Sequence, residues 1–152
     1  MSGGATRPWA ENAFRVLAAR GYRAGGGRAA VIESLAERDG CVTARELAAS
    51  LSGGARPVGM ATVYRSLGAL EEAGLVHAVD LGGGERHYEL VHDDGTHHHH
   101  VVCERCGRKV PFHDHELERS IERIGERLDT QISAHDVVLR GICRDCSAAA
   151  GG

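Results

Sequence analysis

The sequence predicts an α+β fold in which an N-terminal winged helix-turn-helix precedes a small α/β domain. Two observations carry this prediction. Three apolar repeats at helical spacing, followed by two strand patterns around a glycine run, occupy residues 28–90. Beyond them, a strand, an amphipathic helix and a second strand alternate with two Cys-x-x-Cys motifs. We place the boundary after residue 84, which gives domains of residues 1–84 and 85–152.

Two helices open the first domain. The first follows a glycine-rich turn, ends near residues 39–40 and carries apolar residues at helical spacing, namely Val31, Ile32, Leu35 and Ala36. The second begins at a capping box, with Thr43 as the cap and Glu46 three residues later, and its apolar stripe is Leu47, Ala48 and Leu51.

A third helix and a hairpin complete this domain. Gly74 ends the helix, whose apolar residues recur at intervals of three and four, namely Met60, Val63, Leu67 and Leu70. The same helix presents Thr62, Arg65 and Ser66 outward. Strand patterns at residues 75–79 and 86–90 flank three glycines, so we expect a hairpin that forms the wing.

The second domain is predicted to be a strand–helix–strand unit. Its strands cover residues 96–102 and 137–142, and its helix covers residues 116–128 with Asp114 as a cap. One face of that helix is apolar, with Leu117, Ile121, Ile124 and Leu128, and the opposite face is charged. Because so small a unit buries its apolar faces poorly, we expect it to form a dimer.

Composition and charge set broad limits. Hydrophobic residues make up 42% of the chain, as in a typical globular protein. Residues 1–84 carry nine Arg against eight acidic residues, and residues 85–152 carry nine basic against thirteen acidic residues. Charge therefore permits a nucleic-acid partner for the first domain without demonstrating one. No signal-peptide pattern or membrane-length apolar run is present, from which we expect a cytoplasmic protein with no membrane partner.

Metal-ligand residues are concentrated in the second half. All ten histidines lie between His77 and His135, and every cysteine except Cys41 belongs to one of two Cys-x-x-Cys motifs, which contain Cys103, Cys106, Cys143 and Cys146. Two such motifs provide four thiolates, a closed tetrahedral set that predicts structural zinc. The alternatives are a redox disulfide pair and ordinary core cysteines, and a reducing cytoplasm disfavours structural disulfides.

Four consecutive histidines precede the first of these motifs. On a strand, His98 and His100 share one face while His97 and His99 share the other, so one strand can serve two metal sites. A solvated polar strand or a non-specific metal-binding tract is the alternative. Imidazole binds zinc, nickel and iron alike, so ligand type does not select the metal.

Several motifs together resemble the ferric uptake regulator family. They are the GMATVYRSL run at residues 59–67, the EAGLV run at residues 72–76, the histidine run with its following Cys-x-x-Cys-Gly, and the late Cys-x-x-Cys. The similarity extends from about Phe14 to Cys146. It also includes AARGYR at residues 18–23, although residues 24–27 replace the polar residues usual before Arg28.

The resemblance implies a homodimer that binds operator DNA when a sensing metal is present. Tyr64 and Arg65 match the recognition-helix pair that contacts DNA, Arg23 matches a contact to the DNA backbone, and Thr62 lies on the same outward helix face. Core packing is the alternative role for Tyr64, and a solvated helix face is the alternative for the arginines.

The resemblance also implies two metal sites besides the cysteines. The sensing site is expected to comprise His77, Glu89, His98 and His100, with Cys41 competing with His77 and His92 able to replace Glu89. Cys41 departs from the iron-type pattern, and His77 favours the zinc uptake regulator branch. The second site is expected to comprise His97, His99, Glu118 and His135, for which a salt-bridging helix face and a loop residue are the alternative roles of the last two.

The resulting hypothesis is a metal-dependent repressor of metal-uptake genes, with structural Zn²⁺ and regulatory Zn²⁺ or Fe²⁺. The alternatives are a peroxide-sensing repressor of the same fold and a zinc-buffering protein without a DNA role. We expect no enzymatic activity, because no general-base or substrate-pocket motif accompanies the predicted ligands.

Overall fold

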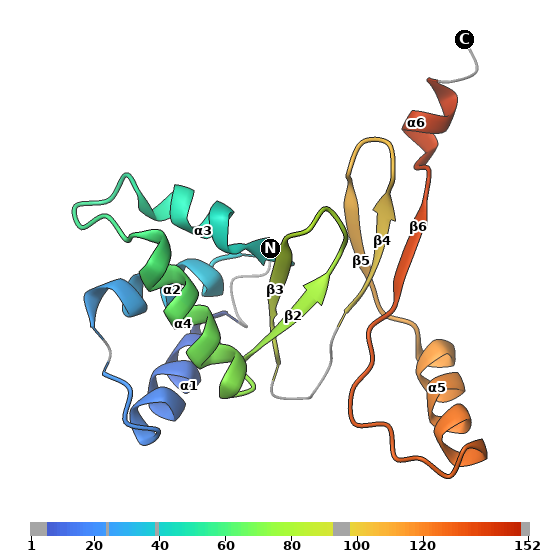
Figure 1. The fold of residues 1–152 in the computed structure, drawn as a ribbon, viewed down its shortest axis with the longest axis horizontal. Coiled ribbons are helices and arrows are strands. Elements are labelled where there is room, and N and C mark those ends of the chain that lie inside the picture. Colours follow the sequence, from blue (N-terminus) through green and yellow to red (C-terminus); the bar gives the residue numbers. More distant parts are fainter. Residues whose placement is uncertain (1–5, 24, 39, 93–97, 150–152) are drawn as a thin grey trace. The chain divides into compact units, whose positions relative to one another are not determined.

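Helices dominate the first part of the computed structural model, which describes residues 6–23, 25–38, 40–92 and 98–149 (Figure 1). The helices are α1 (Thr6–Ala19), α2 (Gly26–Ala36), α3 (Ala44–Leu51) and α4 (Met60–Glu72). The strands are β1 (Val42–Thr43), β2 (Val76–Asp80) and β3 (Arg86–Leu90). Helices α3 and α4 with the β2–β3 hairpin form the expected winged helix-turn-helix.

One apolar core holds these elements together. It contains residues from every helix of this part and from the sheet, and Val63, Leu67 and Leu70 place one face of α4 in it. Helix α1 was not predicted, although Trp9, Ala13 and Leu17 recur every four residues and are all buried. The Trp9 indole N–H donates to the Leu75 carbonyl at 3.2 Å and anchors α1 to the start of the hairpin.

The sheet of this part has the strand order β1-β3-β2, with antiparallel pairing throughout. Tyr88 pairs with Ala78 and Leu90 pairs with Val76, and these four side chains pack on the helical core. Since side chains alternate along a strand, His77, His87 and Glu89 lie on the opposite face. The sequence analysis did not identify β1, because its two β-branched residues are too short a run to show a strand pattern.

The predicted capping box starts α3. The Thr43 hydroxyl accepts the Glu46 backbone N–H at 3.1 Å, and the Glu46 carboxylate accepts the Thr43 backbone N–H at 2.8 Å. Thr43 is 4% exposed, so water cannot readily replace these bonds. The prediction from sequence is confirmed.

Replacing Thr43 by alanine is therefore expected to lower the free energy of unfolding by about 1–2 kcal/mol. Thermal and urea unfolding followed by circular dichroism measure this loss. Thr43→Ser keeps the hydroxyl and is expected to retain most of the stability. Equal stabilities for the alanine and serine variants would show that the cap contributes nothing.

The second part of the chain folds around a small sheet. Its elements are β4 (His99–Cys103), β5 (Lys109–Phe112), α5 (His115–Arg127), β6 (Val138–Gly141) and α6 (Arg144–Ala148). The central strand β4 pairs antiparallel with β5 and parallel with β6. Asp114 caps α5 as predicted, accepting the N–H groups of Glu116 and Leu117 at 2.8 and 3.0 Å.

The two compact units of the chain are Met1–Thr96 and His97–Gly152, which we call the first and second units. The sequence analysis placed the boundary after residue 84, ahead of β3. The structure differs there because β3 pairs with both β1 and β2 and so belongs to the first unit. None of the helices in the described ranges has the length and apolar character that crossing a membrane requires.

Candidate metal centres and nucleic-acid interface

The four predicted cysteines of the second unit lie together. Cys103 ends β4, Cys106 lies in the following turn, and Cys143 and Cys146 lie at the start of α6, with all four sulfur atoms within 4.8 Å of one another. The Sγ atoms of Cys106 and Cys143 are 3.8 Å apart. A tetrahedral zinc ion with Zn–S bonds of about 2.3 Å separates its sulfurs by roughly 3.8 Å, so the donor set and its spacing fit zinc.

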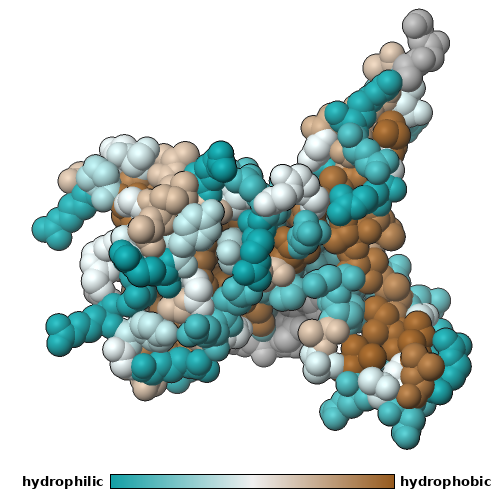
Figure 2. Space-filling model, in the orientation of Figure 1, coloured by the Kyte–Doolittle hydropathy of each residue, from teal (hydrophilic) through white to brown (hydrophobic). Residues whose placement is uncertain are grey.

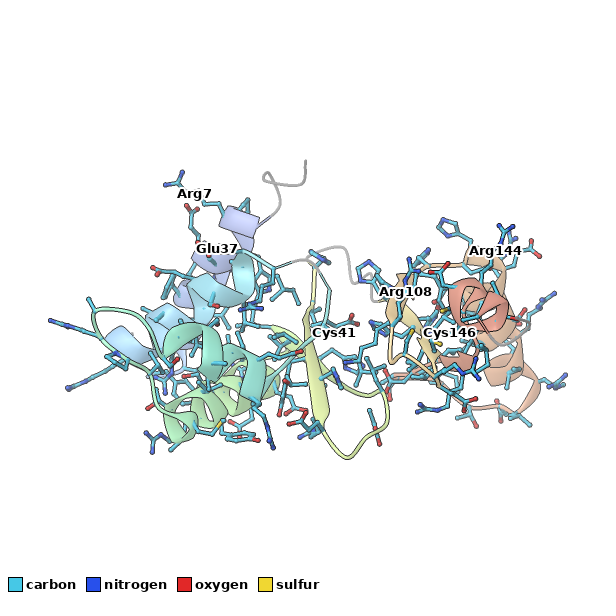
Figure 3. All side chains as sticks on the ribbon, turned by 90° about the horizontal axis from the view of Figure 1, so that it is seen from above. Arg7, Glu37, Cys41, Arg108, Arg144 and Cys146 are labelled. Carbon is cyan, nitrogen blue, oxygen red and sulfur yellow. The ribbon has the colours of Figure 1, made fainter. Side chains whose placement is uncertain are left out.

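Backbone pairing brings these two motifs together. Cys103 is the register partner of Gly141 in the parallel β4–β6 pair, so the end of β6 lies beside the first Cys-x-x-Cys motif. The turn after Cys103 closes through the Gly107 N–H, which donates to the Cys103 carbonyl at 2.9 Å, and Gly107 has a positive φ of 72°. Figure 3 shows Cys146 near Arg108 and Arg144 in the second unit.

The thiols of this cluster differ in acidity. Hydrogen bonds from the backbone N–H groups of Cys106 and Cys143 lower the pKa of the Cys103 thiol to about 6. Hydrogen bonds with the Cys143 and Cys106 side chains raise the pKa of Cys146 to about 12. The cluster therefore retains protons at neutral pH, and a metal ion that binds all four thiolates releases them.

A second group of ligand residues joins β4, α5 and the segment before β6. His99 Nε2 lies 2.7 Å from Glu118 Oε1, and His135 Nε2 lies 3.1 Å from Glu118 Oε2. His99 is fully buried. Burial raises the pKa of Glu118, but the hydrogen bonds and charges of His99 and His135 outweigh it and leave that pKa below its usual value. His97, the remaining predicted member, lies outside the described residues.

The predicted sensing-site residues of the first unit share a sheet face. His77 on β2 is the direct cross-strand partner of Glu89 on β3. On the other side of β3, Val42 pairs with Tyr88, and one further step along this register reaches Cys41 and Glu89 (Cys41 is labelled in Figure 3). Cys41 itself lies just before β1, so the strand pairing covers His77 and Glu89, and Cys41 stays a candidate beside them.

Each unit also has a buried histidine on a strand, His87 on β3 and His100 on β4. His87, which the sequence analysis missed, is 4% exposed and lies on the same face as Glu89, two residues before it. The sequence feature that could have identified His87 is its spacing of two residues from Glu89 on a predicted strand, which places both side chains on one face. His100 of the second unit is also buried, whereas His98 and His92 are half-buried. Within the described residues, three or more ligand atoms converge at two places only, the cysteine cluster and the His99 group.

The predicted DNA-contact residues lie on the outward side of α4 and before α2. Tyr64 is 55% exposed, which rules out core packing for it, and Arg65 is exposed as well. The Arg65 guanidinium donates to the Thr62 hydroxyl at 3.3 Å. Arg23 is exposed, and its carbonyl accepts a 2.8 Å hydrogen bond from Arg28. This face offers cationic and hydroxyl donors of the kinds that contact phosphates and base edges.

Comparisons with known proteins agree with these features. Residues 19–140 match the Ferric uptake regulator family. The ferric uptake regulation protein of Neisseria meningitidis is 38% identical over 91 residues, which cover 60% of this chain and 62% of that protein, less than two thirds of its length.

Solved structures give the same result. The Vibrio cholerae ferric uptake regulator has a TM-score of 0.72 at 30% identity, covering 86% of this chain and 98% of that one. A zinc uptake regulator in complex with zinc and DNA has a TM-score of 0.65 at 25% identity, covering 97% of this chain and 98% of that one.

Proposed function

The chain belongs to the ferric uptake regulator family, and on that premise we propose that it is a metal-dependent repressor that binds operator DNA as a homodimer. Membership places it among transcription regulators rather than enzymes. The observation that carries the proposal is the exposed Tyr64–Arg65 face of α4 on a winged helix-turn-helix, in one chain with two convergent sets of metal ligands.

The ligand sets differ in the role they suit. Cys103, Cys106, Cys143 and Cys146 would hold a structural Zn²⁺, because four thiolates leave no open coordination position. His99, Glu118 and His135, joined by His97, would hold a second ion. A bound ion supplies charge and fixed ligand geometry, and Zn²⁺ and Fe²⁺ both suit mixed imidazole and carboxylate donors.

We propose that His77, Glu89, His98 and His100 hold the regulatory ion, with Cys41 as an alternative donor to His77. The cross-strand pairing of His77 with Glu89 supports this proposal. Ligands from both units would restrain the two units in an arrangement that lets paired α4 helices read successive major grooves. By linkage, the regulatory ion then binds more tightly when DNA is present. Such a dimer reads a pseudo-palindromic operator of metal-uptake genes, and its place of action is the cytoplasm.

The dimer is assigned to an apolar row on the second unit. Val101 pairs with Val110 on one side and Leu139 on the other, so the three side chains cross one sheet face, and they are 37%, 43% and 50% exposed. Apolar surface gathers over the second unit in Figure 2. A partner copy that covers this row would remove it from water.

Replacing Leu139 by aspartate is expected to weaken the dimer by about 2–4 kcal/mol, roughly 30- to 1000-fold in dissociation constant, because it buries a charge in the apolar row. Sedimentation equilibrium of the zinc-loaded chain measures the change. Leu139→Met keeps the apolar surface and serves as the matched control. Identical dimer affinities for the two variants would place the interface elsewhere.

Selection from a random duplex library tests the proposed function. We expect zinc- or iron-loaded full-length chain to enrich a pseudo-palindromic sequence and chelator-treated chain to enrich none. If no sequence is enriched when every ligand set holds a metal ion, a zinc-buffering role is supported instead. Enrichment without metal would contradict metal control of DNA binding.

A further inference from the structure

A pair of histidines stands outside every ligand set described above. His113 lies between β5 and α5, His115 is the first residue of α5, Asp114 separates them, and both histidines are exposed. Their ring centroids lie 4.7 Å apart with an interplanar angle of 76°. We propose that these two imidazoles form a surface site for a borderline divalent cation such as nickel, zinc or copper(II).

The backbone brings the two rings to one side of the chain. Asp114 has φ −140° and ψ 111°, an extended conformation. In an extended segment, residues i and i+2 project to the same side while the residue between them projects to the other. His113 and His115 therefore share a side because of the backbone conformation at Asp114, and a chance meeting of two flexible side chains is not needed to explain their contact.

The segment is also fixed by the helix that follows it. Asp114 accepts the backbone N–H groups of Glu116 and Leu117 at 2.8 and 3.0 Å, and so caps the 13-residue helix α5. This cap holds the backbone between the two histidines before any ion arrives, which lowers the ordering cost of chelation.

Charge around the pair favours a cation. The positive end of the α5 dipole opposes one. The acidic residues Asp114 and Glu116, at the cap and in the first helical turn, offset that effect. The Asp114 oxygen that caps the helix is already engaged, so the imidazole nitrogens remain the direct ligands and the carboxylates act through charge.

Ligand chemistry sets the class of ion. Neutral imidazole prefers borderline transition metals over calcium or magnesium, which prefer oxygen donors. Two protein ligands on an exposed surface leave further coordination positions to water, so the site is weaker than the cysteine cluster and exchanges its ion with solvent. Its occupancy is thus expected at metal concentrations above those that fill the other sets.

Equilibrium dialysis of the full chain against nickel tests this site, with the cysteine cluster loaded with zinc beforehand. At saturation the His113→Asn/His115→Asn variant is expected to bind one equivalent fewer than the unsubstituted chain. Each single substitution is expected to lose the same equivalent, because one imidazole alone does not chelate. Glu122→Gln, an exposed change further along α5 and outside the acidic group beside the pair, is expected to keep it.

Two results would overturn the site: an unchanged stoichiometry in the double variant, or an equal loss in Glu122→Gln. Circular dichroism of the double variant is expected to match the unsubstituted chain, since Asp114 still caps α5. The readout is a count of nickel ions without DNA, so its outcome is separate from that of the proposed repressor function.

Discussion

Removing the ion from the four-cysteine cluster is expected to unfold the second unit while the first unit stays folded. The reason lies in where the apolar core is. Every residue of the main buried cluster belongs to the first unit. Among the described residues of the second unit, the buried apolar side chains are Val102 and Cys103.

A unit with so little buried apolar surface needs another source of stability. Structural zinc contributes about 10–16 kcal/mol of apparent binding free energy in zinc-finger peptides at neutral pH, and that energy acts as folding energy. Loss of the ion is thus expected to cost the second unit several kcal/mol, more than a small unit has to lose.

Amide hydrogen exchange before and after chelation measures this effect. Protection in β4, β5 and β6 is expected to disappear, and protection in α2 and α4 to remain. Cys143→Ser is expected to behave like the chelated chain, whereas Cys41→Ser, a cysteine outside the cluster, retains protection in both units. Persistent protection of β4 in the zinc-free chain would refute a structural role for the ion.

Replacing Arg65 by alanine is expected to weaken operator binding by about 1–3 kcal/mol, roughly 5- to 150-fold. Arg65 is exposed on α4 and bonds Thr62, so its loss removes a cationic donor from the proposed reading face and leaves the helix core intact. Tyr64→Ala is expected to act in the same direction, since its ring is 55% exposed and supports no packing in the core.

Fluorescence anisotropy over a range of salt concentrations separates the two ways in which Arg65 can act. If Arg65 contacts a phosphate, its loss reduces the slope of log affinity against log salt concentration by about one and weakens binding to all sequences alike. If Arg65 contacts a base, its loss relaxes specificity at one position of the operator. Arg119→Ala, an exposed arginine of α5, is the matched control and is expected to leave operator affinity unchanged. An unchanged affinity for Arg65→Ala would remove α4 from the proposed interface.

Local signals account for what was predictable in the fold. The capping box at Thr43 and the cap at Asp114 act within a few residues, and both are present in the structure. The apolar stripe of α4 is buried as predicted except at Met60, which is 39% exposed, and Ser66, expected to face outward, is buried instead. Elements that depend on partners were missed. Strand β1 has two residues held by pairing with β3, β5 contains Pro111, and the five-residue α6 starts inside the second cysteine motif.

The candidate sites divide in the same way. Cysteine spacing reports a shared ion directly, so the four cysteines could be grouped from sequence, and the structure brings their sulfurs together. The pairing of Glu89 with His77 follows from strand register, which spacing alone does not provide. His87 was overlooked because its burial depends on that register, and the His113–His115 pair because it depends on the extended conformation at Asp114.

We propose that a metal ion at His77, Glu89, His98 and His100 controls DNA binding. The most direct measurement is anisotropy of the selected duplex while free zinc, iron(II), manganese or nickel is buffered under anaerobic conditions. We expect one metal to raise the affinity of the unsubstituted chain about 5- to 150-fold, and to have no such effect on His98→Ala/His100→Ala. A DNA affinity that no metal changes, or that changes equally in the variant, would contradict control by a metal at these residues.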